Sequence, residues 1–134
     1  MLRRIHHVGI VVPSLDEGLK FWRDLLGLPP TKSATLEDQG VRAALLRIGT
    51  SEIELLEPLS PQSGVGRFLA RFGGGLHHVC FETGDVGREL AAARAKSLPL
   101  IDEHPRPGLA GMICFLHPKA THGVLVEYAQ PPEE

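Results

Sequence analysis

The sequence predicts an α+β fold built from two similar βαβββ modules, because the chain nearly repeats itself. The first half opens with an apolar run around the adjacent histidines His6 and His7. The second half opens with a similar run around His77 and His78, at a constant offset of 71 residues (78 − 7 = 71). A polar turn and a helical pattern follow each run, and late in each half an apolar run contains a glutamate. Three matching features in the same order indicate a duplicated module.

The composition is that of an ordinary globular protein. A chain of 134 residues with 43% hydrophobic and 22% charged residues suits one compact domain, or two small modules that share a core. The net charge of −2 gives no electrostatic reason to expect nucleic acid or an anionic membrane as partner. Cys80 and Cys114 lie in apolar runs, as small buried side chains do. Since no stretch could span a bilayer and no secretory signal opens the chain, we expect a cytoplasmic protein.

The first half should form a strand, a helix and three further strands. Residues 4–12 are apolar and β-branched and end at Pro13, which predicts a buried strand. Ser14 is a suitable N-cap for a helix over residues 15–26, whose apolar residues recur at helical spacing, and Gly27 ends that helix. Shorter runs between polar turns predict three strands, at 31–36, 41–48 and 52–57.

The second half repeats this order after a linker rich in proline and glycine. We expect one domain over 1–134, with module one at 1–59, the linker at 60–75 and module two at 76–134. In module two, Asp85 should cap a helix between an opening strand and three return strands. These elements are expected at 76–83 (strand), 86–97 (helix), and 99–101, 111–117 and 123–129 (strands). The stretch from Pro105 to Gly111 is expected to be a loop that closes over a ligand.

The glutamates of the late apolar runs, Glu54 and Glu127, indicate a functional site. Burying a carboxylate without a partner is costly, so each glutamate needs a cation, a base or a proton. Neighbouring side chains of a strand point to opposite faces, so only one histidine of each pair can face a shared site, and periodicity does not decide which. Two imidazoles and two carboxylates would suit Zn²⁺, Co²⁺, Mn²⁺, Ni²⁺ or Fe²⁺. A single strand histidine or glutamate is usually structural, but the duplication favours a metal site.

Five segments of the chain resemble a known family. They are His7-Val8-Gly9-Ile10-Val11-Val12, Ile53-Glu54-Leu55-Leu56-Glu57-Pro58-Leu59, Gly75-Leu76-His77-His78-Val79, Phe115-Leu116-His117-Pro118-Lys119 and Gly123-Val124-Leu125-Val126-Glu127. These segments are similar to the vicinal-oxygen-chelate superfamily and, within it, most closely to the methylmalonyl-CoA epimerases. The resemblance implies that the two modules form a cupped mixed sheet around one divalent metal. It also implies that the ligand histidine is the one directly before valine, so that the metal ligands are His7, Glu54, His78 and Glu127.

The resemblance further implies an activity. A methylmalonyl-CoA epimerase interconverts the C2 epimers of its acyl-CoA substrate by proton abstraction through a metal-stabilised enolate. Glu127 would be both ligand and catalytic base, with Co²⁺, Mn²⁺, Ni²⁺ or Zn²⁺ as cofactor, and the resemblance also implies a homodimer. Some relatives carry a glutamate three residues after the glycine of a Gly-Val segment, but here that segment is Gly40-Val41-Arg42-Ala43. Since Ala43 cannot move a proton, the second acid or base is not identified.

Three more residues are candidates for substrate binding, and two other functions stay open. His117 and Lys119 either contact the CoA thioester or phosphates or simply form a turn. Arg106 either binds the substrate carboxylate or is solvated in its loop. The alternatives are a glyoxalase I-like lyase that acts on a glutathione hemithioacetal and a metal-free, resistance-type protein that binds a small molecule. The first would need a basic cluster for the glutathione carboxylates, which the sequence does not show.

Overall fold

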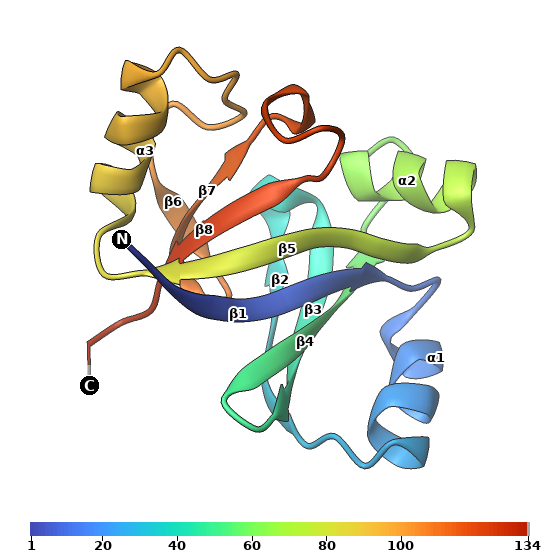
Figure 1. Ribbon diagram of the computed structural model, residues 1–134. Coiled ribbons are helices and arrows are strands. Elements are labelled where there is room, and N and C mark those ends of the chain that lie inside the picture. The colour runs from blue at the N-terminus through green and yellow to red at the C-terminus, as the bar shows by residue number, and fades with distance from the viewer. Residues whose placement is uncertain (134) are drawn as a thin grey trace. The chain divides into compact units, whose positions relative to one another are not determined.

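The computed structural model describes residues 1–133 and contains the two predicted βαβββ modules (Figure 1). The first module consists of β1 (Leu2–Val11), α1 (Leu15–Leu19), β2 (Pro30–Leu36), β3 (Val41–Ile48) and β4 (Ser51–Pro58). The second consists of β5 (Gly75–Thr83), α3 (Val86–Ala95), β6 (Arg106–Gly108), β7 (Gly111–Leu116) and β8 (Val126–Gln130). Between them, α2 (Gly64–Phe72) occupies most of the predicted linker.

The strands form a mixed sheet in the order β2-β3-β4-β1-β5-β8-β7-β6. Each opening strand pairs in parallel with the last strand of its own module, β1 with β4 and β5 with β8. The return strands of each module pair with one another antiparallel. The predicted α+β class and the mixed sheet of two modules are therefore confirmed.

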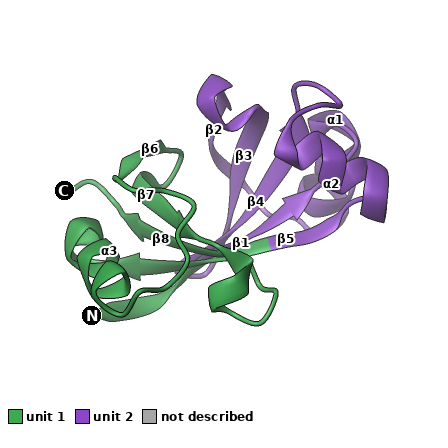
Figure 2. Ribbon diagram, turned by 90° about the horizontal axis from the view of Figure 1, so that it is seen from above, with its two compact units in different colours: residues 1–6, 78–134 green, residues 7–77 purple. Residues whose placement is uncertain are grey.

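The chain divides into two compact units, which Figure 2 colours separately. Unit 2 contains residues 7–77, and unit 1 contains residues 1–6 and 78–134, of which Glu134 lies outside the described residues. The start of β1 thus belongs to the same unit as the second module. The predicted bounds of module one, linker and module two stay a prediction.

In unit 2, the helix side of the strands forms an apolar core. Ser14 caps α1, as predicted, by accepting a hydrogen bond from the backbone N–H of Glu17 at 3.1 Å. The predicted helix over 15–26 is α-helical only to Leu19 and continues as a π-helix over Lys20–Leu25. This core combines Leu15 of α1 and Val12, which directly follows β1, with strand residues, of which one side chain in two faces the helix. Its buried residues are Ile10, Val12, Leu15, Ala44, Leu46 and Leu55.

In unit 1, α3 covers its strands in the equivalent way. Asp85 caps the helix by accepting a hydrogen bond from the backbone N–H of Arg88 at 3.0 Å. Val86 and Leu90 of the helix pack on Cys114 and Tyr128 of the strands. Tyr128 therefore points to the helix side of β8, and its neighbours in the sequence point to the opposite face.

The first return strand of the second module was predicted in the wrong place. Residues 99–101 contribute only one isolated bridge, between Leu100 and Leu116, and the strand is β6, inside the stretch predicted as a loop. Backbone hydrogen bonds still hold residues 101–102 beside β7, because the N–H groups of Ile101 and Asp102 both donate to the carbonyl of Phe115. Across residues 1–133, no helix is both long and apolar enough to cross a membrane.

Candidate metal centre

In unit 2, the strand register brings His7 and Glu54 together. Gly9 of β1 lies opposite Glu54 of β4, and His7 lies two residues before Gly9 on the same face. The His7 Nε2 and Glu54 Oε1 atoms are 3.5 Å apart. Both residues are buried, with 1% and 6% of their surface exposed. Because the neighbouring residue Leu55 packs in the core under α1, this pair lies on the face away from the helix.

Unit 1 repeats this arrangement with His78 and Glu127. Cys80 of β5 lies opposite Glu127 of β8, and His78 lies two residues before Cys80. The His78 Nε2 and Glu127 Oε1 atoms are 3.0 Å apart, and both residues are buried. Each unit therefore holds one buried imidazole–carboxylate pair, at corresponding positions of the parallel strand pair and on the face away from its helix.

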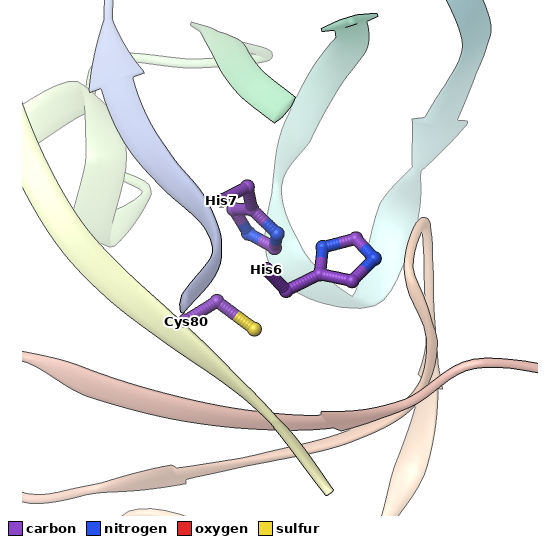
Figure 3. A group of neighbouring side chains, drawn as sticks. All are labelled: His6, His7 and Cys80. Carbon is purple, nitrogen blue, oxygen red and sulfur yellow. The ribbon is translucent and has the colours of Figure 1, made fainter. Parts of the chain in front are cut away.

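The other histidine of each doublet has different neighbours. His77 packs edge-on against the Phe68 ring of α2, with 5.1 Å between the ring centroids and 75° between the ring planes. Figure 3 shows His6 and His7 as successive residues of β1, with Cys80 on β5. His6 and Cys80 are both buried in unit 1, and a ring nitrogen of His6 lies within 4.8 Å of the Cys80 sulfur. This proximity was not predicted from the sequence, and two donors alone do not complete a metal site.

The donor chemistry of the two pairs fits a divalent metal ion. Imidazole nitrogen and carboxylate oxygen are ligands that first-row divalent ions accept, and the two pairs supply two of each. Burial also removes the competing hydration of the carboxylates, which increases their need for a positive partner.

Arg106 lies on the same face of unit 1 as Glu127. The register pairs Arg106 with Ile113 and Phe115 with Glu127, and Ile113 and Phe115 are two residues apart on β7. The guanidinium carbon of Arg106 is 5.7 Å from the centroid of the Phe115 ring. That ring in turn meets the His78 imidazole edge-on, at 5.7 Å between centroids and 89° between planes. Arg106 and His78 thus contact the same aromatic ring.

His117 and Lys119 form a turn directly after β7. His117 caps a short 3₁₀ helix (Pro118–Ala120), and its Nδ1 accepts a hydrogen bond from the backbone N–H of Lys119 at 3.1 Å. Because Nδ1 is the acceptor, the proton of this ring is carried by Nε2. Lys119 is exposed. The turn is thus observed, whereas a contact of either side chain with a substrate stays a prediction.

Ala43 lies on the face of unit 2 that carries the His7–Glu54 pair. It pairs with Leu56, while Leu45, two residues along β3, pairs with Glu54. Side chains two residues apart share a face, so the Ala43 methyl group lies on the face of Glu54, and it is fully buried. A carboxylate at this position would face the same side of the sheet as the His7–Glu54 pair.

Two titratable groups near the site belong to the helix side of unit 1 instead. Burial raises the pKa of the Cys114 thiol to about 12, and burial also raises the pKa of the Tyr128 hydroxyl. Both side chains pack against α3. A thiol with such a pKa is not a nucleophile at neutral pH, and we assign neither group a chemical role.

The chain is similar to known proteins in sequence and in structure. The family model of the Glyoxalase/Bleomycin resistance protein/Dioxygenase superfamily matches residues 6–115. The ethylmalonyl-CoA/methylmalonyl-CoA epimerase of Cereibacter sphaeroides is 36% identical over 97% of this chain and 99% of its own length. The human mitochondrial methylmalonyl-CoA epimerase is 34% identical over 96% of this chain and 74% of its own length. A variant of methylmalonyl-CoA epimerase from Streptomyces coelicolor, solved in complex with 2-nitronate-propionyl-CoA, is similar in structure. It has a TM-score of 0.94 and 40% identity, and the match covers 99% of this chain and 100% of that one.

Proposed function

The chain belongs to the glyoxalase/bleomycin resistance protein/dioxygenase superfamily, and we propose that it is a metal-dependent epimerase that interconverts the C2 epimers of methylmalonyl-CoA. The observation that carries this proposal is the buried imidazole–carboxylate pair that occurs once in each unit. Similarity to epimerases of this substrate over nearly the whole chain supports the choice of reaction.

The proposal assigns one divalent ion to His7, Glu54, His78 and Glu127. The two pairs occupy corresponding positions in their units, and the strands that carry the histidines, β1 and β5, are neighbours in the strand order. The ion is Co²⁺, Mn²⁺, Ni²⁺ or Zn²⁺, all of which accept this ligand set. When bound, it supplies Lewis acidity, which stabilises negative charge on a carbonyl oxygen of the substrate.

Glu127 is the group that removes the C2 proton. That proton is flanked by the thioester and carboxylate carbonyl groups of the substrate, so a carboxylate base is sufficient when the developing charge is stabilised. His78, 3.0 Å away, fixes the orientation of the carboxylate, and both side chains are buried. Inversion requires proton delivery to the opposite side of C2. Because position 43 is an alanine, we assign this delivery to water.

Three further residues bind the substrate in this proposal. Arg106 meets the carboxylate of the malonyl group, because a guanidinium pairs well with a carboxylate and this one lies on the face of Glu127. His117 offers its Nε2–H to the thioester, and the exposed Lys119 meets the phosphates of CoA.

Deuterium uptake at C2 of methylmalonyl-CoA in D₂O tests the function. We expect Co²⁺-loaded protein to exchange this proton, chelated protein to lose the activity, and Glu127→Gln to lose about 10²- to 10⁴-fold in rate. Glu103→Gln, which changes an exposed carboxylate of the same unit, is the control and should keep the full rate. A wild-type protein that binds metal but exchanges no proton would overturn the epimerase, and full exchange after chelation would overturn the metal requirement.

The proposal includes a homodimer, and a cytoplasmic location stays a prediction. Several large apolar side chains of unit 2 are exposed, and exposed apolar residues of this kind are typical of protein interfaces. They are Phe21, Leu25, Leu26, Phe72 and Leu76. Sedimentation equilibrium at micromolar concentration should give twice the chain mass of 14.6 kDa, and the mass of one chain would contradict the dimer.

A further inference from the structure

Asp102 connects two parts of unit 1 that flank the His78–Glu127 pair. Its Oδ1 lies 3.0 Å from Nε of Arg106, and its Oδ2 accepts a hydrogen bond from the backbone N–H of Phe115 at 2.8 Å. Its side chain is 13% exposed. The Asp102 carboxylate therefore contacts both the Arg106 guanidinium and the backbone of β7. That strand carries the Phe115 ring, which lies between Arg106 and His78.

The bond to Phe115 has a specific consequence for Glu127. In an antiparallel pair, the N–H and C=O of one residue point either both toward the partner strand or both away from it. Both groups of Phe115 bond to the segment 101–102, so they point away from β8. Phe115 and Glu127 are therefore a non-hydrogen-bonded pair, the kind in which facing side chains lie closest. Asp102 thus helps to fix the ring that lies beside Glu127.

The contact with Arg106 fixes the orientation of the guanidinium. Asp102 meets the guanidinium at Nε, on one edge of the planar group. The edge formed by Nη1 and Nη2 presents two parallel N–H donors, one from each nitrogen, in a fork that matches a carboxylate. A guanidinium held at Nε and stacked near an aromatic ring loses less conformational freedom when it binds an anion than a free side chain would.

From this geometry we infer that Asp102 is a positioning residue for recognition of the substrate carboxylate, acting through Arg106 and Phe115. The inference rests on the proposed function, because it takes the substrate to be an acyl-CoA with a carboxylate on the acyl group. It assigns Asp102 no contact with the substrate. Its role is to hold Arg106 in the orientation that distinguishes a malonyl-type thioester from a thioester without the second carboxylate.

Two acyl-CoA probes separate this role from a purely structural one. Methylmalonyl-CoA carries the carboxylate, and propionyl-CoA is the same thioester without it. In Co²⁺-loaded protein, the dissociation constants of both are measured by calorimetry, together with KM and kcat for methylmalonyl-CoA. The variants are Asp102→Asn, Arg106→Gln, Arg106→Lys and the double variant Asp102→Asn/Arg106→Gln. The control is Glu103→Gln, which changes the neighbouring carboxylate of the same loop, one that faces Arg94.

A charge-assisted contact of this kind should be worth roughly 10- to 100-fold in binding. We expect Asp102→Asn and Arg106→Gln to raise KM and the dissociation constant of methylmalonyl-CoA by that factor. The dissociation constant of propionyl-CoA should change less than about twofold. Arg106→Lys should not restore binding, because an ammonium lacks the fork. The double variant should equal Arg106→Gln alone, since Asp102 acts through that residue, and Glu103→Gln should resemble wild type.

Other results would overturn the inference in distinguishable ways. An equal loss of affinity for both thioesters in Asp102→Asn would mean a merely structural role. Unchanged affinity for methylmalonyl-CoA in Arg106→Gln would mean that the carboxylate is recognised elsewhere, and this variant decides the point even if Asp102→Asn does not fold. Wild-type protein that binds neither thioester overturns the inference as well. Wild-type protein that prefers methylmalonyl-CoA but does not turn it over would overturn the proposed function and leave the role of Asp102 supported.

Discussion

Replacing Glu54 by glutamine should remove most of the stability that the protein gains from a divalent ion. Glu54 is buried, with 6% of its surface exposed, and its carboxylate lies 3.5 Å from the His7 imidazole. Glutamine keeps the shape of the side chain and an oxygen that can accept a hydrogen bond. It lacks the negative charge, which makes it a much weaker ligand for a divalent cation.

The expected magnitude follows from mass action. An ion at about 100 times its dissociation constant stabilises the folded state by roughly 2.7 kcal/mol. For a chain of this length, about 3–5 °C of Tm corresponds to 1 kcal/mol, which predicts a rise of roughly 8–13 °C on metal addition. Even the loss of a group that only hydrogen-bonds to a metal ligand weakens metal binding about 10- to 100-fold. If Glu54→Gln costs about 100-fold, the same ion concentration contributes only about 0.4 kcal/mol, or about 1–2 °C.

Differential scanning calorimetry with and without Co²⁺, after chelation, measures both values. Glu52→Gln is the matched control, because Glu52 lies two residues earlier on the same face of β4 and accepts a hydrogen bond from the Thr31 hydroxyl at 2.8 Å. It should keep the full rise in Tm. A full rise in Glu54→Gln would refute the assignment of Glu54 as a ligand. An equal loss in both variants would mean that the charge of the face, rather than a specific ligand, binds the ion.

Three predictions concern the rest of the chain. A hydrogen bond from the N-terminal ammonium group holds the pKa of Glu89 below its usual 4.5, so its contribution to stability is present above that value and is lost as the pH falls through the lower folded pKa. Denaturation between pH 3 and 7 should therefore show that Glu89→Gln is less stable than wild type at neutral pH, with the difference vanishing in acid. Because burial raises the pKa of Cys114 to about 12, Cys80→Ser protein should bind a thiol reagent at pH 8 only after unfolding. Both Gly111→Ala and Gly123→Ala place a side chain at positive φ, at a cost of roughly 1–3 kcal/mol. Gly111→Ala should lower Tm further, because its Cβ would lie 2.2 Å from a backbone carbonyl oxygen, whereas the space at Gly123 is open.

Local signals in the sequence were sufficient for most of the fold. The caps at Ser14 and Asp85 predicted the starts of α1 and α3, because short polar side chains there satisfy the first free N–H groups of a helix. The strand β6 was missed because its sequence, Arg106–Gly108, contains the proline and glycine that usually mark a loop. This strand lies at the end of the sheet, where a residue without an N–H is tolerated.

The candidate site was only partly accessible from the sequence. The duplication revealed the His/Glu pattern, but periodicity could not decide between the histidines of each doublet. The structure pairs His7 and His78 with glutamates and packs His77 against a phenylalanine of α2. The connection from Asp102 to Phe115 was not predictable, because it depends on how a segment without regular structure lies beside a strand.

Substitution of Ala43 should restore the missing acid or base. Ala43→Glu places a carboxylate on the same face as Glu54. Position 43 lies two residues before Leu45, the residue of β3 that pairs with Glu54. We expect it to raise the rate of inversion relative to the rate of deuterium uptake, since a second group can then deliver a proton to the opposite side of C2. We also expect lower stability, because the position is fully buried and a carboxylate there is costly.

Two variants decide whether such a gain comes from the carboxylate and from its place. Ala43→Gln adds the same volume without a titratable group, and Ala44→Glu adds the same carboxylate on the opposite face, in the core under α1. Both should lose stability, and neither should change the ratio of inversion to uptake. An Ala43→Glu protein that folds and exchanges the C2 proton with an unchanged ratio would contradict the reasoning. In that case the second proton would reach the substrate by a route on which a carboxylate at this position has no effect, and water would suffice as its source.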